Sequence, residues 1–469
     1  MKLRQKAKGK RQKAKPDLCK LAVCFSLVYI LFIPSISVHF AQSFNVPFKQ
    51  FQLENGLRVV LSEDHAAPVV AVAVYYDVGS RNEVKGRSGF AHLFEHMMFQ
   101  GSENIEKAGH FKYVENNGGF LNGSTHTDYT NYYEFLPSNQ LEMALWLESD
   151  RMRSLKITPA NLQNQKEAVK EEKRLNVDNQ AYWPALTKMD EAIFKNWANA
   201  HSTIGSMADL DAATITDVKN FFKIYYAPNN AVLAIAGDID LAQAETLVRK
   251  YFSTIAKQPA PPAVDVTEPF ETVLQKNLAE DTHAETPAIA IAWKLPPRRA
   301  PDAYPIAMLK SILFDGESAR LYQTLVKDKQ VALEVQGMMD ERRGPSALTV
   351  FSILKQDAKP EQIQSLIEAE FERIKSAGVS REELAKVKNQ YRLGQFVGGE
   401  DGEYTSVQTA LGRALMLAEY TLFDNDPSLI NTELERYLAV TPEQVRNAAK
   451  KYFGTANRTV LYIKPAARK

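Results

Sequence analysis

The most chemically specific stretch of the sequence is residues 89–100, Gly-Phe-Ala-His-Leu-Phe-Glu-His-Met-Met-Phe-Gln. On an α-helix, His92 and His96 are one turn apart, so both imidazoles project from one face at a spacing that suits a tetrahedral zinc ion. Glu95 is a neighbour on that face, and its carboxylate can take a proton from a water molecule in the open coordination position of the zinc. The order H-x-x-E-H therefore predicts a catalytic centre with one Zn2+ per chain.

A simpler explanation is that two histidines and a glutamate lie by chance on a solvated helix. The neighbouring residues argue against it, because Leu93, Phe94, Met97, Met98 and Phe99 make the segment apolar. Polar groups without partners cost several kcal/mol in such surroundings. A bound metal supplies the missing partner.

The composition is that of a soluble globular protein, and 469 residues are too many for a single core. The net charge of +1 hides an asymmetry, because residues 1–41 carry nine Lys or Arg and one acidic residue. The remainder is acidic by about seven charges, which argues against nucleic acid as a partner. Both cysteines, Cys19 and Cys24, lie in this first segment, so the body can form no disulfide.

The first 41 residues have the plan of a signal peptide. A basic region, residues 1–20, precedes an uncharged apolar run at 21–33 and then small residues up to Ala41. We expect cleavage near Ala41 and export, to the periplasm or out of the cell. The alternative is an uncleaved membrane anchor at residues 21–40, which is near the lower length limit for spanning a bilayer.

Several elements must position the zinc motif. The dipeptide Asn55-Gly56 predicts a turn between two strands within residues 52–61. The β-branched run at 69–78 predicts a central strand that leads into the motif. Further along, the patterns predict helices at 111–117, 141–153, 159–177 and 214–226, a strand, turn and strand over 118–135, and a strand at 231–236.

The helix at 159–177 contains Lys170-Glu171-Glu172-Lys173, which can supply a third protein ligand. A charge run on a long helix is more often only a solvated face. Spacing alone leaves both interpretations open.

The second half of the sequence repeats the plan of the first. The run at 287–293 matches the strand at 69–78, and the apolar helix at 304–314 takes the place of the motif helix without its ligands. Residues 441–461 repeat the pattern of residues 214–233.

We therefore predict an α+β fold of two tandem homologous domains, each an antiparallel sheet packed with helices, related by internal duplication. The N-terminal metal-binding domain is placed at residues 45–256 and a proline-rich linker at 257–266. The C-terminal domain, without metal, is placed at 267–469.

The body, residues 45–465, resembles the pitrilysin/insulinase family of zinc peptidases, and within it the short-chain branch that includes mitochondrial processing peptidase. Besides the inverted motif, the matching blocks are Leu121-Asn-Gly-Ser-Thr, Asp128-Tyr-Thr-Asn-Tyr-Tyr, Ile204-Gly, Asp209-Leu, Asp217-Val and Tyr226-Ala-Pro-Asn-Asn-Ala. The family takes its third zinc ligand from a downstream helix. Aligning Glu167-Ala-Val-Lys-Glu-Glu with that helix selects Glu172 over Glu171.

Two positions depart from the family pattern. Where the family often has a Glu that orients the site, this chain has Gln165, which can still hydrogen-bond. Val326 and Leu333 stand where family members have an Arg and a Tyr that reach the substrate from the domain opposite the metal. We therefore expect a heterodimer with a homologous subunit that supplies Arg and Tyr, with a homodimer as the alternative. Arg320 or Tyr322 taking over within the chain is a further alternative.

The expected function is a zinc-dependent endopeptidase that hydrolyses peptides or unfolded segments in a closed chamber, with Glu95 activating the zinc-bound water. Asn122 is a candidate donor to the substrate backbone, although it can also serve only its own turn. The strand containing it would bind peptides by β-augmentation if it lies at a sheet edge. The alternatives are a zinc hydrolase of a non-peptide amide or ester, and a non-catalytic scaffold subunit of a peptidase complex.

Overall fold

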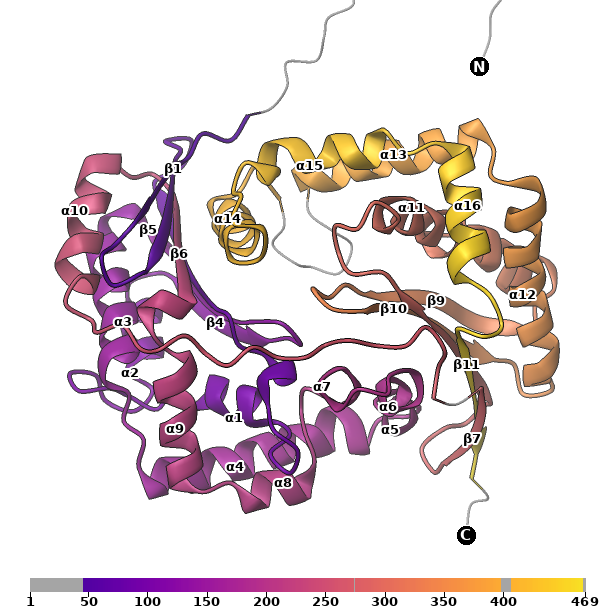
Figure 1. The fold of residues 1–469 in the computed structure, drawn as a ribbon, viewed down its shortest axis with the longest axis horizontal. Coiled ribbons are helices and arrows are strands. Elements are labelled where there is room, and N and C mark those ends of the chain that lie inside the picture. The colour runs from indigo at the N-terminus through magenta and orange to yellow at the C-terminus, as the bar shows by residue number, and fades with distance from the viewer. Residues whose placement is uncertain (1–44, 274, 398–405, 467–469) are drawn as a thin grey trace, which may run out of the picture. The chain divides into compact units, whose positions relative to one another are not determined.

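The structure is a computed structural model that describes residues 45–273, 275–397 and 406–466 (Figure 1). The expected signal peptide or anchor, residues 1–41, lies outside the described residues. Within them, no helix is both long enough and apolar enough to cross a membrane.

The first sheet has six strands in the order β1-β2-β6-β3-β5-β4. These strands are β1 (Lys49–Gln52), β2 (Arg58–Glu63), β3 (Val69–Tyr76), β4 (Phe120–Thr125), β5 (Thr130–Pro137) and β6 (Ala231–Gly237). The turn between β1 and β2 lies at the expected place, where Gly56 takes a φ of 91° that favours glycine. β4 is an edge strand of this sheet.

The second sheet has five strands in the order β7-β11-β8-β10-β9. They are β7 (Lys276–Asp281), β8 (Ala288–Leu295), β9 (Ala332–Asp340), β10 (Ser346–Leu354) and β11 (Arg458–Pro465). This order is that of the first sheet without β1, as internal duplication predicts.

Neither sheet is purely antiparallel, which corrects the sequence-based expectation. β2 pairs with β6 in parallel, and β7 pairs with β11 in parallel at the equivalent place. A parallel pair needs a long crossover between its strands. Here nearly the whole of each half, helices included, lies between the two parallel strands in the sequence. The hydrophobic pattern within a single strand does not show which distant strand it pairs with.

A buried asparagine makes the duplication visible in atomic detail. The Asn230 side chain donates to the carbonyls of Asp77 and Tyr225, at 3.1 and 2.9 Å. The Asn457 side chain donates to the carbonyls of Lys294 and Tyr452, at 2.6 and 3.0 Å. The Asn230 amide thus joins the end of β3 to the end of α9, and the Asn457 amide joins the end of β8 to the end of α16.

The helices of the first half are α1 (Phe90–Met97), α2 (Gly109–Asn116), α3 (Leu141–Ser154), α4 (Pro159–Lys173), α5 (Trp183–Leu186), α6 (Met189–Ile193), α7 (Trp197–Ala200), α8 (Met207–Ala212), α9 (Ile215–Tyr225) and α10 (Leu241–Phe252). Apolar residues of α1, α3, α9 and α10 form one core with the first sheet. Between α10 and β7 the described residues form neither helix nor strand, in the region of the expected linker.

The helices of the second half are α11 (Ala303–Phe314), α12 (Pro360–Ala377), α13 (Arg381–Val397), α14 (Ala410–Asp424), α15 (Leu429–Leu438) and α16 (Pro442–Tyr452). Trp293 of β8 is almost fully buried against Phe371 and Phe453, at the centre of the second core.

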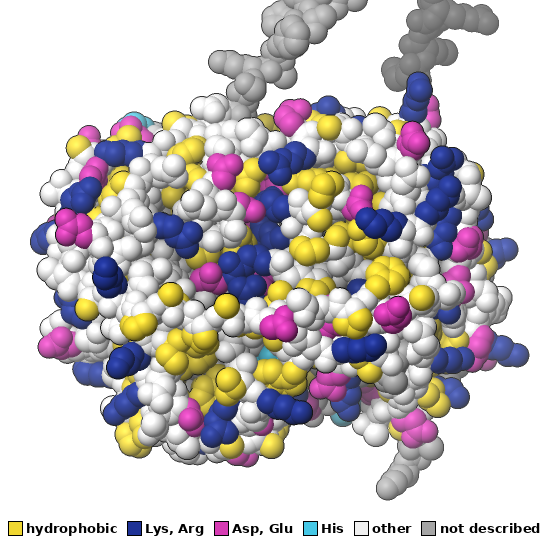
Figure 2. All heavy atoms as spheres, in the orientation of Figure 1, with side chains coloured by type: hydrophobic (Ala, Val, Ile, Leu, Met, Phe, Trp, Pro, Cys, Tyr) yellow, Lys and Arg dark blue, Asp and Glu magenta, His cyan; other side chains and the backbone are white. Residues whose placement is uncertain are grey.

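Charged side chains of both signs are interspersed over the face drawn in Figure 2.

Each half also covers the remaining face of the other sheet. Apolar residues of α14 and α15 pack on Val60, Ala71 and Tyr75 of the first sheet, and Figure 1 shows α14 beside β6. In return, residues 182–200 of the first half pack on the alanine-rich face of β8. The two sheets are separate in sequence, but their outer faces are buried by exchanged helices.

Candidate metal centre

The metal helix α1 is fixed by its apolar side. Leu93, Phe94 and Met97 are almost fully buried, which leaves His92 and His96 to face α4. The helix begins after Gly89, whose φ is 83°. A Cβ on the neighbouring Gly205 would lie 2.5 Å from the Gly89 nitrogen, so the two glycines allow this close approach.

A buried carboxylate caps the start of α1. Glu83 accepts hydrogen bonds from the Gly89 and Ala91 amides at 2.9 and 2.7 Å. Its carboxylate also lies 2.9 Å from Nε2 of His201. Negative charge at a helix N-terminus is stabilised by the unpaired amides there. Glu83 therefore anchors the helix that carries the motif.

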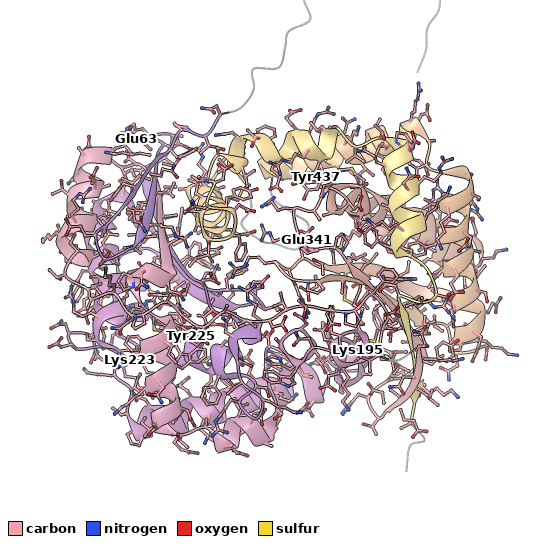
Figure 3. All side chains as sticks on the ribbon, in the orientation of Figure 1. Glu63, Lys195, Lys223, Tyr225, Glu341 and Tyr437 are labelled. Atoms are coloured by element: carbon pink, nitrogen blue, oxygen red, sulfur yellow. The ribbon has the colours of Figure 1, made fainter. Side chains whose placement is uncertain are left out.

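Residues of α8 and α9 hold the loop that leads into α1. Asp209 accepts from the Ser88 amide at 2.9 Å and from the Ser88 hydroxyl at 2.5 Å. The hydroxyl of Tyr225, which is labelled on α9 in Figure 3, donates to the Asn82 carbonyl at 3.1 Å. These bonds fix the loop between β3 and α1, and therefore the start of α1.

The second ligand helix, α4, is anchored along its length. The Thr158 hydroxyl accepts the Asn161 amide at 3.2 Å and caps its N-terminus. Lys166 donates to the Asp211 carbonyl at 2.7 Å, and Lys170 pairs with the Asp211 carboxylate at 2.8 Å. The last turns of α4 thus stay close to α8 and next to α1.

Three of the predicted residues converge at this place. One ligand atom each from His92, His96 and Glu172 lies within 4.8 Å of the others. The Glu172 carboxylate is 3.6 Å from Nε2 of His92 and 3.2 Å from Nε2 of His96. A tetrahedral zinc with bonds of about 2.0 Å separates its ligand atoms by about 3.3 Å, so the donor set fits the ion in number, type and spacing.

The structure distinguishes the two candidate glutamates of α4. Glu171 is exposed and pairs with Arg174 at 2.9 Å, away from the histidines. Glu172 faces them. Burial and the nearby His96 lower the pKa of His92 to about 4, so its ring is neutral, as a metal ligand requires.

Glu95 is the buried acidic group of this face, 9% exposed. The Thr125 hydroxyl of β4 donates to its Oε2 at 2.7 Å. Burial raises the pKa of Glu95, and the Thr125 hydrogen bond offsets part of that rise. Gly123 leaves the room for this contact, because a Cβ there would lie 3.3 Å from Cγ of Glu95.

Gln165 lies on the same face of α4 as Glu172, two turns before it. Burial lowers the pKa of His96, but the hydrogen bond that Glu172 accepts, the negative charges of Glu95 and Glu172, and a hydrogen bond with Gln165 together raise it. The Gln165 amide donates to Asn164 at 2.8 Å, which fixes its orientation. The carboxamide is thus placed to orient His96.

Asn122 lies on the edge strand β4 but on the face opposite to Gly123 and Thr125. Its side chain is exposed, and its amide oxygen accepts the Gly123 amide at 2.9 Å. The residue is therefore accessible, but its oxygen serves its own strand.

The positions that depart from the family pattern lie in the second half. Val326 is packed against the second core, and Leu333 on the edge strand β9 is 55% exposed. Arg320 is engaged by Glu383 through Nε and Nη2, at 2.7 and 2.8 Å, and by Glu370 through Nη1 at 2.9 Å. This guanidinium is therefore occupied by carboxylates of its own half.

Three residues of the site had not been identified from the sequence: Glu83, His201 and Thr125. Glu83 and His201 are 118 positions apart, and Thr125 is 30 positions from Glu95. Their roles depend on contacts between segments that are distant in the sequence, which no local pattern shows. Thr125 did lie in a matching block, which was the one available signal.

Two family models match the chain: "Insulinase (Peptidase family M16)" over residues 58–205 and "Peptidase M16 inactive domain" over residues 212–391. "Zinc protease PqqE" of Helicobacter pylori is 27% identical over 433 residues, 92% of this chain and 95% of its own length. "Probable mitochondrial-processing peptidase subunit beta" of Arabidopsis thaliana is 26% identical over 207 residues, 44% of this chain and 39% of its own. The crystal structure of a protease from Helicobacter pylori matches with a TM-score of 0.84 and 25% identity, covering 90% of this chain and all of that one.

Proposed function

Because the chain belongs to the insulinase family, peptidase family M16, we propose that it is a zinc-dependent endopeptidase that hydrolyses peptides or unfolded segments. The single observation that carries the proposal is the convergence of His92, His96 and Glu172 beside the buried carboxylate of Glu95. Three protein ligands and a nearby base are the pattern of a catalytic rather than a structural zinc site.

Each side chain has a separate task in this proposal. His92, His96 and Glu172 would hold the ion, and a zinc ion bound there would act as a Lewis acid that polarises the scissile carbonyl and favours deprotonation of water. Glu95 accepts the proton of the attacking water and delivers it to the leaving amine. Thr125 fixes the carboxylate of Glu95 through its hydroxyl.

The edge strand β4 is the proposed binding surface for the substrate backbone. An extended peptide added to this edge would lie next to α1, since β4 packs against α1. Asn122 is the proposed side-chain contact. A closed chamber, which the family resemblance implies, would exclude folded proteins and admit peptides and unfolded segments.

The decisive experiment measures metal content and hydrolysis together. Purified protein should contain about one zinc per chain, cleave members of a peptide library, lose this activity with a chelator and regain it with added zinc. His96→Ala should lose both zinc and activity. Cleavage that persists in metal-free protein, or cleavage of esters but not peptides, would overturn the proposal.

We also propose that a homologous subunit supplies the Arg and Tyr missing at Val326 and Leu333. The engagement of Arg320 by Glu370 and Glu383 supports this, because the guanidinium that could have replaced the missing Arg is already paired within its own half. A homodimer is the alternative partner arrangement.

Export is proposed from the sequence alone. If the leader is removed, mass spectrometry of the mature protein should find its N-terminus near Gln42. An intact leader in the membrane fraction would support an anchor at residues 21–40 instead.

A further inference from the structure

Two arginines and two aspartates form a balanced cluster where the halves meet. Nη1 of Arg81 donates to Asp128 at 2.6 Å, and Nη2 of Arg81 donates to Asp77 at 3.2 Å. Arg343, in the turn between β9 and β10, donates to Asp77 through both terminal nitrogens, one of them at 3.2 Å. The Arg343 amide also donates to the Asp128 carboxylate at 2.6 Å. Arg343 is thus the member that the second half contributes.

The two aspartates belong to the two segments that position Glu95. Asp77 directly follows β3 and begins the loop that leads into α1. Asp128 lies in the turn directly after β4, three residues beyond Thr125, whose hydroxyl holds Glu95. Arg343 therefore ties the approach to the metal helix to the strand that fixes the base.

The loop and the turn are already in tight contact. The Ser80 amide donates to the His126 carbonyl at 3.1 Å, and the Arg81 amide donates to the Thr127 carbonyl at 3.2 Å. A Cβ on Gly79 would lie 2.3 Å from the His126 oxygen, so the two backbones allow no side chain between them. A displacement of one segment is therefore transmitted to the other.

A second element of the other half contacts the same turn. The Phe423 ring of α14 lies 4.6 Å from the Arg343 guanidinium carbon and 5.5 Å from the centre of the Tyr129 ring. Tyr129 in turn stacks on His126 at 4.4 Å. The turn after β4 is thus held by two elements of the second half.

We propose that Arg343 is a positioning residue of the catalytic centre. It clamps the loop after β3 to the turn after β4, and so keeps α1 and Thr125 in the relative position that Glu95 requires. The inference rests on the proposed peptidase function and extends it, since it gives the half without ligands a direct role in the geometry of the base. Geometric errors of about 1 Å at a reacting group can cost about a hundredfold in rate.

The first test uses Arg343→Met, with Arg343→Lys as the conservative variant and Arg458→Met as the matched control. Arg458 forms an ion pair with Glu368 wholly within the second half. Arg343→Met should keep its zinc and lower kcat about tenfold while KM stays within about threefold, and Arg343→Lys should recover part of the loss. Arg458→Met should leave kcat unchanged. An unchanged kcat in Arg343→Met would overturn the inference.

A double-mutant cycle separates positioning from a general loss of stability. If Arg343 acts through Thr125, Arg343→Met combined with Thr125→Val should be little worse than Thr125→Val alone. Fully additive losses of kcat would contradict the proposal.

Amide hydrogen exchange provides a readout that needs no activity. Arg343→Met should speed exchange in residues 124–130 and 78–91, and Arg458→Met should not. If the wild-type protein cleaves no peptide, the proposed function fails while the exchange experiment still decides the clamp. Unchanged exchange in both segments would refute the clamp even in an active enzyme.

Discussion

Glu95 differs from the other buried acids near α1 in the weakness of its anchoring. Glu83 is held by two amides and a histidine, whereas Glu95 accepts a hydrogen bond from the neutral Thr125 hydroxyl. Burial raises the pKa of Glu95, and the neutral Thr125 hydroxyl offsets only part of that rise, so the carboxylate remains a competent base. This difference supports a chemical role for Glu95 and a structural one for Glu83.

We therefore predict that Glu95→Gln keeps the metal and loses the reaction. The amide has the same shape and can still accept the Thr125 hydrogen bond, so folding and zinc content should not change. The rate should fall at least about a hundredfold, because the amide cannot accept a proton. Zinc analysis and peptide hydrolysis on the same sample measure both effects. Near-normal hydrolysis would show that another group is the base.

The sequence was most informative where chemistry and helical spacing coincide. His92, Glu95 and His96 are related within one helix, so their common face follows from 3.6 residues per turn. Glu172 is different, because spacing alone does not distinguish it from Glu171 as the third zinc ligand. Only the resemblance to the family favours Glu172. Thr125 contacts Glu95 across two elements, and no local pattern encodes such a contact.

At the scale of single elements, the start of α13 shows how a helix can stabilise the second half. Ser380 and Glu383 form a reciprocal cap, in which the Ser380 hydroxyl accepts the Glu383 amide at 3.1 Å and Glu383 accepts the Ser380 amide at 2.9 Å. The hydrogen bond from Arg320 is the main reason that the pKa of Glu383 falls from 4.5 to about 2. The carboxylate thus serves the cap and the ion pair together.

The low pKa of Glu383 predicts a pH-dependent contribution to stability. A depressed pKa stabilises the folded state fully above the unfolded value of 4.5, and this contribution is lost as the pH falls toward 2. Glu383→Gln should lower the free energy of unfolding by about 1 kcal/mol at pH 7, since the side chain is about a third exposed and solvent screens the pair.

Urea denaturation of both proteins, at pH 7 and at several values below 4.5, measures this effect. The difference between wild type and Glu383→Gln should shrink as the pH falls. Glu382→Gln, at an exposed position of the same helix start, is the control and should show little difference at any pH. A difference that is constant with pH would refute the ion-pair explanation.

Element boundaries followed well from sequence where turns were strongly marked, as at Gly56. The parallel pairing of β2 with β6 did not, because it depends on where the chain returns after more than 160 residues. The π-helical turn at Arg174–Asp178 was also absorbed into one long predicted helix. Tertiary packing decides such irregularities, and the amphipathic pattern continues through them.

At the scale of the whole molecule, the exchanged helices predict that the halves cannot be separated. Residues 45–256 alone would expose the face formed by Val60, Ala71 and Tyr75, which α14 buries in the full chain. We expect this fragment to aggregate, and co-expression with residues 257–469 to restore a soluble complex.

Size-exclusion chromatography and thermal unfolding of the fragments would measure the outcome. A monomeric first half with a cooperative transition would show that the helices of the second half are dispensable. Composition indicates where the linker lies, but it does not indicate that each half covers a sheet face of the other. A buried face of a sheet or helix has the same apolar character whichever half packs against it.

A second prediction at this scale concerns the missing Arg and Tyr. Removing one donor to a developing oxyanion typically costs about a hundredfold or more in rate. Val326 and Leu333 donate no hydrogen bond, so the isolated chain should hydrolyse peptides weakly and a homologous partner that retains Arg and Tyr should raise the rate.

The test is co-expression with a candidate partner, followed by the partner with its Arg changed to Ala and its Tyr to Phe. The unaltered partner should raise the rate of peptide hydrolysis, and the partner with both residues changed should not. Full activity of the isolated chain, unaltered by the partner, would contradict the heterodimer.

The edge strand β4 has a further consequence, for solubility and for the release of products. An open strand edge invites pairing with any extended chain, including a second copy of the protein. β4 has the sequence Phe-Leu-Asn-Gly-Ser-Thr, and its Asn and Gly are poor strand formers. Pairing along this edge should therefore be weak and reversible. Cleaved fragments can then leave quickly, and the same weakness keeps two copies of the chain from joining edge to edge.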